Sequence, residues 1–179
     1  MEKRKAKVII GAAGGTAHKD SKTYKISLPS AWIKELGING DRREVELFFD
    51  GKKIILKPVK TVEEFKKDKL DMGHEVKEIK FFDKNGLCTR IYADFTEKTL
   101  AAENYTDNIV KTAFGNNDCP DWNDFVNFFE ERCLPKSRAG IREYLEAIGV
   151  SEYDTMEIIK KTAGRMAEDD QWIEMEDVK

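Results

Sequence analysis

The side chains with the clearest chemical potential are the lysines and arginines of the first 60 residues. They number 14 against 7 carboxylates, which gives this segment a net charge of +7. Such cations bind phosphates and release counterions, so the composition predicts a polyanion partner, although an ordinary solvated basic surface would have the same composition. The residues that we expect to contact phosphates are Lys3, Arg4, Lys5, Lys7, Lys19, Lys22, Lys25, Arg42 and Arg43.

The opposite charge gathers at the other end of the chain. Residues 119–179 hold 8 basic against 15 acidic side chains, net −7, and residues 61–118 carry −3, so the whole chain is at −3. An acidic segment fits solubility, self-docking or a basic protein partner. The candidate residues for a protein partner are Asp121, Asp124, Glu130, Glu131, Arg132, Arg138, Glu168, Asp169 and Asp170.

Two of these candidates, Arg132 and Arg138, belong to the basic island RCLPKSR inside the acidic region. The island predicts an anion or partner site between two helices. The alternative is that both arginines pair with nearby carboxylates such as Glu130 and Glu131, because structural ion pairs are the commoner role of arginine.

Catalytic and metal-binding patterns are weak. The two histidines, His18 and His74, have no serine or cysteine companion at a recognisable spacing, and no zinc motif is present. The glycine-rich loop, residues 11–22, does not match the P-loop motif. The residue types of Asp71, Glu78 and Lys80 occur together in nucleases, but such trios arise by chance in a charge-rich chain. We therefore predict no enzyme, no cofactor and no bound metal, with residues 168–170 forming a solvated acidic loop.

Composition indicates a soluble protein. Charged residues make up 36% of the chain, and no apolar run approaches the roughly 20 residues of a membrane span. The N-terminus lacks the apolar segment of a signal peptide. The three cysteines lack C-x-x-C spacing, which favours reduced thiols and a cytoplasmic location.

The elements that position the basic residues centre on residues 24–38, YKISLPSAWIKELGI. Alternation over residues 24–28 predicts a strand, Pro29 opens a helix to Leu36, and Gly37 ends it. A first strand at residues 7–11 precedes it, and Asp50-Gly51 predicts a hairpin of residues 44–50 and 52–58. This small unit buries too little surface alone, so it requires a partner.

Residues 24–38 followed by GDRREVELFFDGKKIILKPV resemble the AbrB/SpoVT/MazE family of small DNA-binding domains. The resemblance covers about residues 5–60. It implies a swapped-hairpin β-barrel made by two chains, a homodimer, and basic residues placed on double-stranded DNA. The loop between the first two strands is longer and richer in glycine than this family leads us to expect.

The remaining chain divides into three segments. Residues 61–75 form a charge-dense connector, and residues 76–118 a β-hairpin region around Asn85-Gly86 with a possible strand at 99–105. Residues 119–179 form an acidic helical region with helices at 120–133, 137–148 and from Asp154 to about residue 162. With residues 1–60 as the DNA-binding dimerisation domain, the predicted fold class is α+β. The expected core positions of the first two helices are Trp122, Phe125, Val126, Phe129, Ile141, Tyr144, Leu145 and Ile148.

Over its whole length the chain looks like phage and mobile-element proteins, and in particular like a group of type II-A anti-CRISPR inhibitors of Cas9. The segments that prompt this are RCLPKSRAGIREYLEAIGVSEYD and IIKKTAGRMAEDDQWI. The resemblance implies a bacterial host cell and a protein partner, Cas9 or another basic nucleic-acid-binding protein, whose nucleic-acid channel would attract carboxylates. The alternative is an AbrB-type transcriptional regulator that uses the same DNA-binding dimer.

Overall fold

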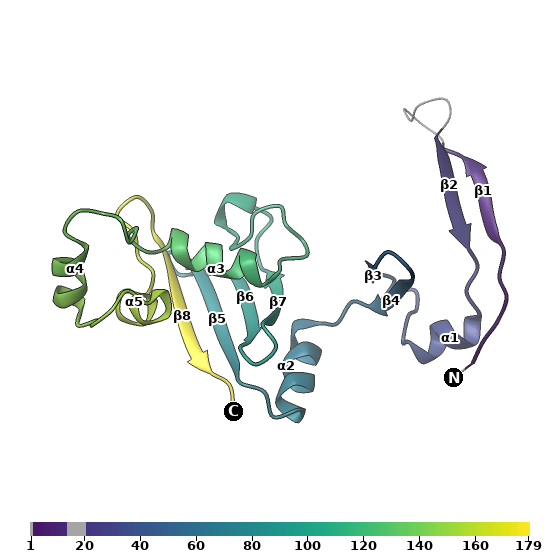
Figure 1. Ribbon diagram of the computed structural model, residues 1–179, viewed down its shortest axis with the longest axis horizontal. Helices are drawn as coiled ribbons and strands as arrows, with labels where there is room; N and C mark the ends of the chain where they lie inside the picture. The colour runs from purple at the N-terminus through teal and green to yellow at the C-terminus, as the bar shows by residue number, and fades with distance from the viewer. Residues whose placement is uncertain (1, 14–20) are drawn as a thin grey trace. The chain divides into compact units, whose positions relative to one another are not determined.

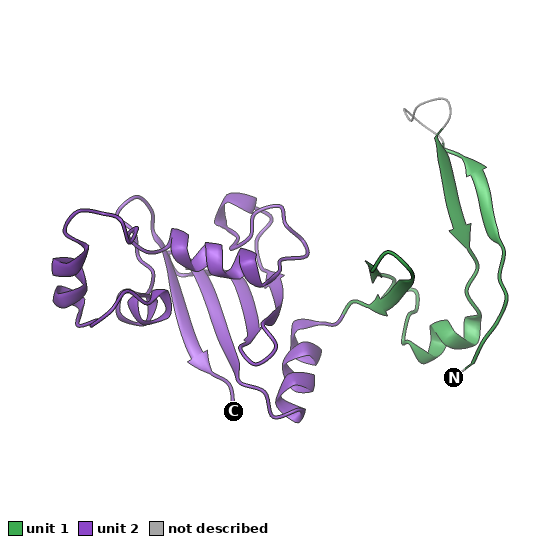
Figure 2. Ribbon diagram, viewed as in Figure 1, with its two compact units in different colours: residues 1–59 green, residues 60–179 purple. Residues whose placement is uncertain are grey.

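The computed structural model describes residues 2–13 and 21–179, and it divides the chain into two compact units. Unit 1 spans residues 1–59 and unit 2 residues 60–179 (Figure 2). The described residues form five α-helices and eight strands, and all the strands pair antiparallel, which confirms the α+β class. No described helix is both long and apolar enough to cross a membrane.

Unit 1 consists of two hairpins joined through one short helix (Figure 1). Strand β1 (Val8–Ala12) pairs with β2 (Lys22–Ile26), and β3 (Val45–Phe49) pairs with β4 (Ile54–Pro58). Between the hairpins lies α1 (Ser30–Glu35), with Pro29 in the N-cap position. The predicted order of strand, proline, helix and hairpin is confirmed, but the described residues of one chain form two separate two-stranded sheets and no closed barrel.

Local chemistry explains where these elements turn. The side chain of Asp50 accepts hydrogen bonds from the backbone amides of Lys52 and Lys53, which closes the hairpin between β3 and β4 and lowers the pKa of Asp50. After α1, Gly37 adopts a φ of 70°. This left-handed conformation favours glycine, so Gly37 ends the helix as predicted.

Unit 2 is built on a four-stranded antiparallel sheet in the order β7-β6-β5-β8. The strands are β5 (Val76–Asp83), β6 (Gly86–Asp94), β7 (Thr99–Asn104) and β8 (Gln171–Asp177). The hairpin between β5 and β6 is confirmed, but its turn residues are Lys84 and Asn85, one position earlier than the Asn85-Gly86 signal, since Asp83 pairs with Gly86. The acidic tail, for which the sequence indicated no strand, supplies β8 and binds along β5.

Helices cover both faces of this sheet. The helix α2 (Val62–Asp71) begins at a capping box between Thr61 and Glu64, so the connector is helical, and it packs beside Val76 and Tyr92. The opposite face carries Ile79 and Ile91, which are fully buried. Over that face lie the 3-10 helix η1 (Ile109–Lys111), α3 (Trp122–Glu131), α4 (Ile141–Ile148) and α5 (Thr155–Thr162) (Figure 1).

The main hydrophobic core lies between the sheet and these helices. Phe125 and Phe129 of α3 are buried as predicted, and their ring centroids lie 4.5 Å apart. The prediction was wrong for Val126, which is 36% exposed, because α3 turns Phe128 toward the sheet instead. Segments 76–118 and 119–179 thus share one sheet and one core.

Candidate functional site

The first hairpin of unit 1 separates apolar from polar side chains by face. Residues directly opposite each other in paired strands point to the same side of a sheet. The register places Val8 opposite Ile26 and Ile10 opposite Tyr24, so one face is apolar, and these four residues are 54–67% exposed. Lys25 pairs with Ile9 and lies on the other face.

The second hairpin also has one apolar face, whereas its other face mixes the apolar pair of Phe48 and Ile55 with the charged pair of Glu46 and Lys57. Leu47 pairs with Leu56 and Phe49 with Ile54, which makes one face continuously apolar. Leu47 is 66% exposed, Phe49 73% and Ile54 70%. The other face carries Lys57, whose ammonium lies 5.0 Å from the centroid of the Phe48 ring.

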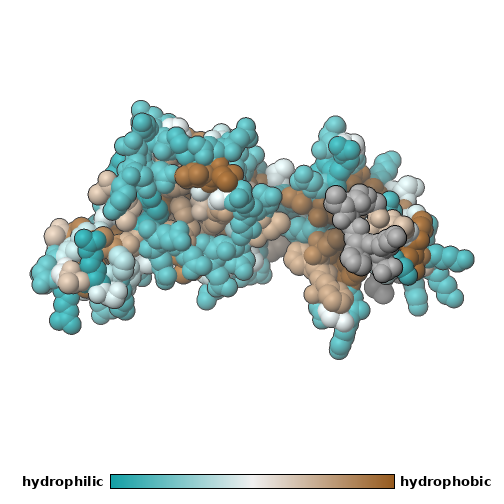
Figure 3. Space-filling view, turned by 90° about the horizontal axis from the view of Figure 1, so that it is seen from above, coloured by the Kyte–Doolittle hydropathy of each residue, from teal (hydrophilic) through white to brown (hydrophobic). Residues whose placement is uncertain are grey.

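These apolar faces have no cover within the chain's own unit. None of the described residues 2–13 and 21–59 is buried. Apolar side chains gather over unit 1 in Figure 3, whereas the visible surface of unit 2 is mostly hydrophilic. Exposed apolar patches of this extent mark surfaces that bind another macromolecule.

The predicted DNA-binding residues fall into different environments. Lys25 lies on the face of β2 away from the apolar side chains, whereas Lys22, at the end of the strand, falls on the apolar side. Lys3, Lys5 and Lys7 are exposed along the segment that leads into β1. Lys19 lies outside the described residues.

The predicted arginines are partly engaged within the unit. The Arg4 guanidinium lies 5.6 Å from the centroid of the Trp32 ring, and the Trp32 indole donates a hydrogen bond to Glu2 at 2.6 Å. Arg42 donates a hydrogen bond from Nη2 to the Val59 carbonyl at 2.9 Å, which ties the start of β3 to the end of β4. Arg43 is exposed. The structure therefore gives Arg4 and Arg42 contacts within the fold, while Arg43 and the described lysines of this set lie at the surface.

Among the residues predicted to bind a protein partner, Arg132 is buried, with only 8% of its surface exposed, and binds groups within unit 2. Its guanidinium donates from Nη1 and Nη2 to Asp169 at 2.6 and 2.9 Å, from Nε to the Gly164 carbonyl and from Nη2 to the Gln171 carbonyl, both at 2.9 Å. The Arg132 guanidinium lowers the pKa of Asp169. This group fastens the end of α3 to the segment between α5 and β8.

The other predicted partner residues are more exposed. Asp121 and Asp124 form the capping box of α3, in which Asp121 accepts the amide protons of Asn123 and Asp124. The carboxylate of Asp170 lies 3.5 Å from Lys84. Asp124 is half-buried, and the exposed residues of this set are Asp121, Glu130, Glu131, Arg138, Glu168 and Asp170.

The structure also brings together a cluster that sequence patterns did not indicate. His74 Nδ1 lies 2.9 Å from the fully buried carboxylate of Asp94, and the Lys69 ammonium lies 2.9 Å from the same carboxylate and 2.5 Å from Glu97. His74, Asp94 and Glu97 could in principle hold a metal, but the Lys69 ammonium already supplies the cation for both carboxylates. Lys69 comes from α2, Asp94 from the end of β6, and His74 and Glu97 from connecting segments, so no fixed sequence spacing indicated them.

Asp94 anchors α2 to the sheet through charged hydrogen bonds. Burial raises the pKa of Asp94, but hydrogen bonds from His74, Lys69 and the amides of Glu97 and Thr96 outweigh burial and lower it to about 2. Because the folded pKa lies below the ordinary value of 3.8, the ionised carboxylate stabilises unit 2 above pH 4. This contribution is lost as the pH falls toward 2.

Replacing Asp94 by Asn should lower the free energy of unfolding of unit 2 by about 2 kcal/mol at pH 7. The difference from the wild type should shrink between pH 4 and pH 2, where the wild-type carboxylate itself becomes protonated. Urea denaturation at several pH values, followed by the fluorescence of Trp122 and Trp172, measures this. An Asp118→Asn variant, altered at an exposed carboxylate, is the control. Equal stability of both variants at pH 7 would contradict the anchoring role.

Comparison with protein-family models, with curated proteins and with solved structures found no match to this chain. Neither a family nor a function follows from similarity.

Proposed function

We propose that unit 1 forms a homodimer that binds double-stranded DNA. The observation that carries this proposal is the exposed, mainly apolar face on each of two hairpins, in a unit that has no buried residue among those described. Domains of about 60 residues are marginal, and this unit buries none of its described side chains, so a second copy that supplies matching apolar faces would provide the missing core.

The strand edges support the same arrangement. Each hairpin has only two strands, so each carries backbone donors and acceptors that are unpaired at its edges. Pairing with the strands of a second chain would satisfy these groups and enclose the apolar faces. A swapped-hairpin barrel is the arrangement of this kind that we propose, because closure into a barrel removes strand edges.

The charges are suited to phosphate binding. Lys25 points away from the apolar face that the dimer would bury, and Lys3, Lys5 and Lys7 are exposed next to β1. Lysines outside the buried faces would neutralise phosphates, which supplies most of the affinity of DNA-binding proteins that lack base contacts.

Replacing Lys25 by Ala should weaken binding to a duplex of arbitrary sequence. It should also lower the salt slope of the affinity by about 1 for each phosphate that the variant no longer neutralises. Fluorescence anisotropy of labelled duplex DNA at several salt concentrations measures both quantities. Lys53→Ala, which changes an exposed lysine in the β3–β4 turn, is the matched control. An unchanged slope for the Lys25 variant would exclude Lys25 from the interface.

For the whole chain we propose an inhibitor that binds both DNA and Cas9. The separation of charge supports this, since residues 1–60 carry +7 and residues 119–179 carry −7, and the nucleic-acid channel of Cas9 is basic. The test is salt-sensitive association with guide-loaded Cas9 and suppression of its DNA cleavage. If neither effect is observed, the inhibitor proposal is wrong and the alternative function, a transcriptional regulator, remains. A regulator should give a single sharp DNA footprint near the promoter of its own gene.

A further inference from the structure

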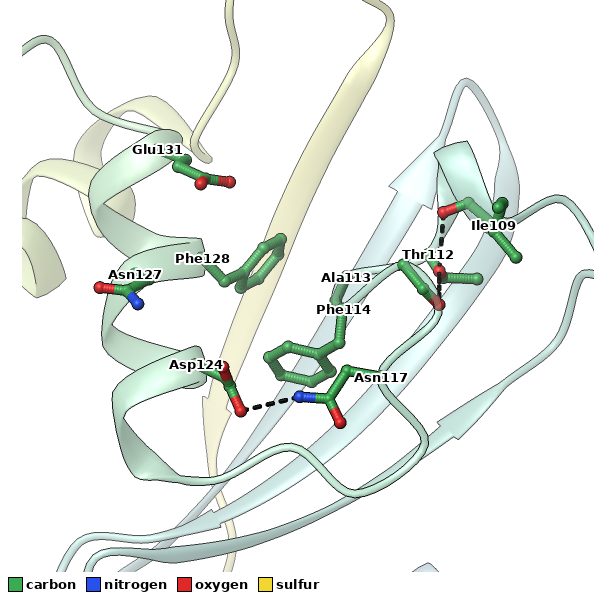
Figure 4. A pocket seen from close by; sticks show the side chains of 10 residues that line it. Ile109, Thr112, Ala113, Phe114, Asn117, Asp124, Asn127, Phe128 and Glu131 are labelled. Carbon is green, nitrogen blue, oxygen red and sulfur yellow. Dashed lines mark hydrogen bonds between the residues drawn. The ribbon is translucent and has the colours of Figure 1, made fainter. Parts of the chain in front are cut away.

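A groove in unit 2 runs between α3 and residues 109–117 (Figure 4). Its volume is about 360 Å³. Phe114 and Phe128 line it, with ring centroids 5.7 Å apart. The wall formed by residues 109–117 is held by Thr112 Oγ1, which lies 2.9 Å from the Ile109 carbonyl oxygen and 3.2 Å from the Gly115 carbonyl oxygen and shares its single proton between them. The groove is therefore a defined surface feature with an aromatic floor.

The charges that line this groove are all negative. Asp124 and Glu131 are its two ionisable lining residues, and no lysine, arginine or histidine of the described residues lines it. The hydrogen bonds that the Asp124 carboxylate accepts from Asn117 and from the Asp121 amide both end on Oδ2, so Oδ1 can accept another donor. Glu131 is exposed, and no ion pair or hydrogen bond to its carboxylate occurs within the described residues. Two acceptors can therefore bind a cationic ligand.

The spacing of these acceptors limits the ligand. Asp124 and Glu131 are seven residues apart on α3, which separates them by about 10 Å along the helix axis. One side chain cannot bridge both carboxylates. A ligand that uses both must carry two cationic groups at a similar separation, with an apolar part over the rings between them.

The rim adds an independent apolar contact surface. Val110 is 80% exposed and Ile109 47%, although unit 2 has a well-formed core of its own. The side chain of Asn108 accepts the Val110 amide proton, which holds η1 in place. Fixed, exposed aliphatic side chains beside a concave surface are typical of protein interfaces.

We propose that this groove binds an extended basic segment of a protein partner through two arginines three positions apart. An extended segment in the polyproline II conformation has three residues per turn and rises about 3.1 Å per residue, so arginines three positions apart lie on the same side about 9 Å apart, close to the separation of the carboxylates along the helix axis. Arginine fits better than lysine because its planar guanidinium binds a carboxylate bidentately and stacks on an aromatic ring. The carboxylates would repel a nucleic acid. The groove lies in unit 2, so binding of the peptide does not depend on DNA binding by unit 1. The proposal rests on the proposed function only in assuming a basic protein partner, and it assigns that partner a binding site.

Short synthetic peptides test the proposal on the full-length protein by isothermal titration calorimetry. The probe is a blocked peptide with the core Arg-Leu-Ala-Arg, compared with a peptide of the same composition whose arginines are adjacent and with one that carries citrulline for arginine. We expect the spaced peptide to bind at least several-fold more tightly than the adjacent one, and the citrulline peptide to bind at least about 10-fold more weakly.

Matched variants locate the binding site. Glu131→Gln should weaken the spaced peptide about 10-fold, because one charge-assisted hydrogen bond is removed, whereas Glu130→Gln, the neighbouring exposed carboxylate outside the groove, should not. Ile109→Ser, at a residue that lines the groove, should weaken it several-fold. Equal binding of the spaced and adjacent peptides, equal effects of the two glutamate variants, or no binding would each overturn the proposal. DNA affinity, measured on the same variants, should be unchanged, so failure here is distinguishable from failure of the DNA-binding function.

Discussion

Replacing Phe49 by Asp should make the protein monomeric and abolish DNA binding. Phe49 is 73% exposed on the apolar face of the second hairpin, and a charge at a surface position of a monomer would change stability by at most about 0.5 kcal/mol. In the proposed dimer the same carboxylate would be buried without a partner, at a cost of several kcal/mol for each chain. Sedimentation velocity and duplex anisotropy measure the two effects.

The control for this prediction introduces the same carboxylate where no burial is expected. Lys52 is exposed in the turn between β3 and β4, so Lys52→Asp should remain dimeric, with DNA affinity lowered only through charge. A wild-type protein that sediments as a monomer at all concentrations, or a Phe49→Asp variant that stays dimeric, would contradict the dimer.

Replacing Arg132 by Ala should lower the free energy of unfolding of unit 2 by about 3 kcal/mol. The change leaves the Asp169 carboxylate without its bidentate partner and removes the donors to the carbonyls of Gly164 and Gln171. It also detaches α3 from the segment that leads into β8. Urea denaturation followed by the fluorescence of Trp122 and Trp172 measures the decrease in stability.

Arg138 is the natural control, because it belongs to the same basic island but is exposed. Arg138→Ala should change the stability by at most about 0.5 kcal/mol. Equal free energies of unfolding for the two variants would contradict the structural role of Arg132. The basic island RCLPKSR would then again be a candidate anion or partner site.

Much of the local structure followed from the sequence because it depends on near neighbours. Pro29 and Gly37 bound the short helix, and Asp50-Gly51 marked a hairpin, since each signal acts within a few residues. Asp154 caps the third predicted helix, because its side chain accepts the Glu157 amide proton. The helix that follows begins one residue later.

Long-range pairing could not be predicted in this way. The strand β8 contains Trp172, Ile173 and Met175 among acidic residues, and its partner β5 lies about 90 residues earlier in the chain. The many charged residues of the tail obscured the alternation of apolar and polar side chains that is typical of a strand and that places Ile173 in the core. In the same way, Arg132 is separated from its partner Asp169 by 37 residues. The alternative of an ion pair with nearby carboxylates such as Glu130 and Glu131 therefore named the wrong partners.

The absence of buried side chains among the described residues of unit 1 has a consequence for how the protein would respond to its own abundance. If folding of this unit requires a second copy, the folded form depends on the square of the chain concentration when dimers are scarce. A tenfold lower chain concentration would then reduce the concentration of binding-competent dimer about a hundredfold. Unit 2, with a core of its own, would stay folded throughout. Expression level alone would thus switch DNA binding on and off, with no ligand or modification required.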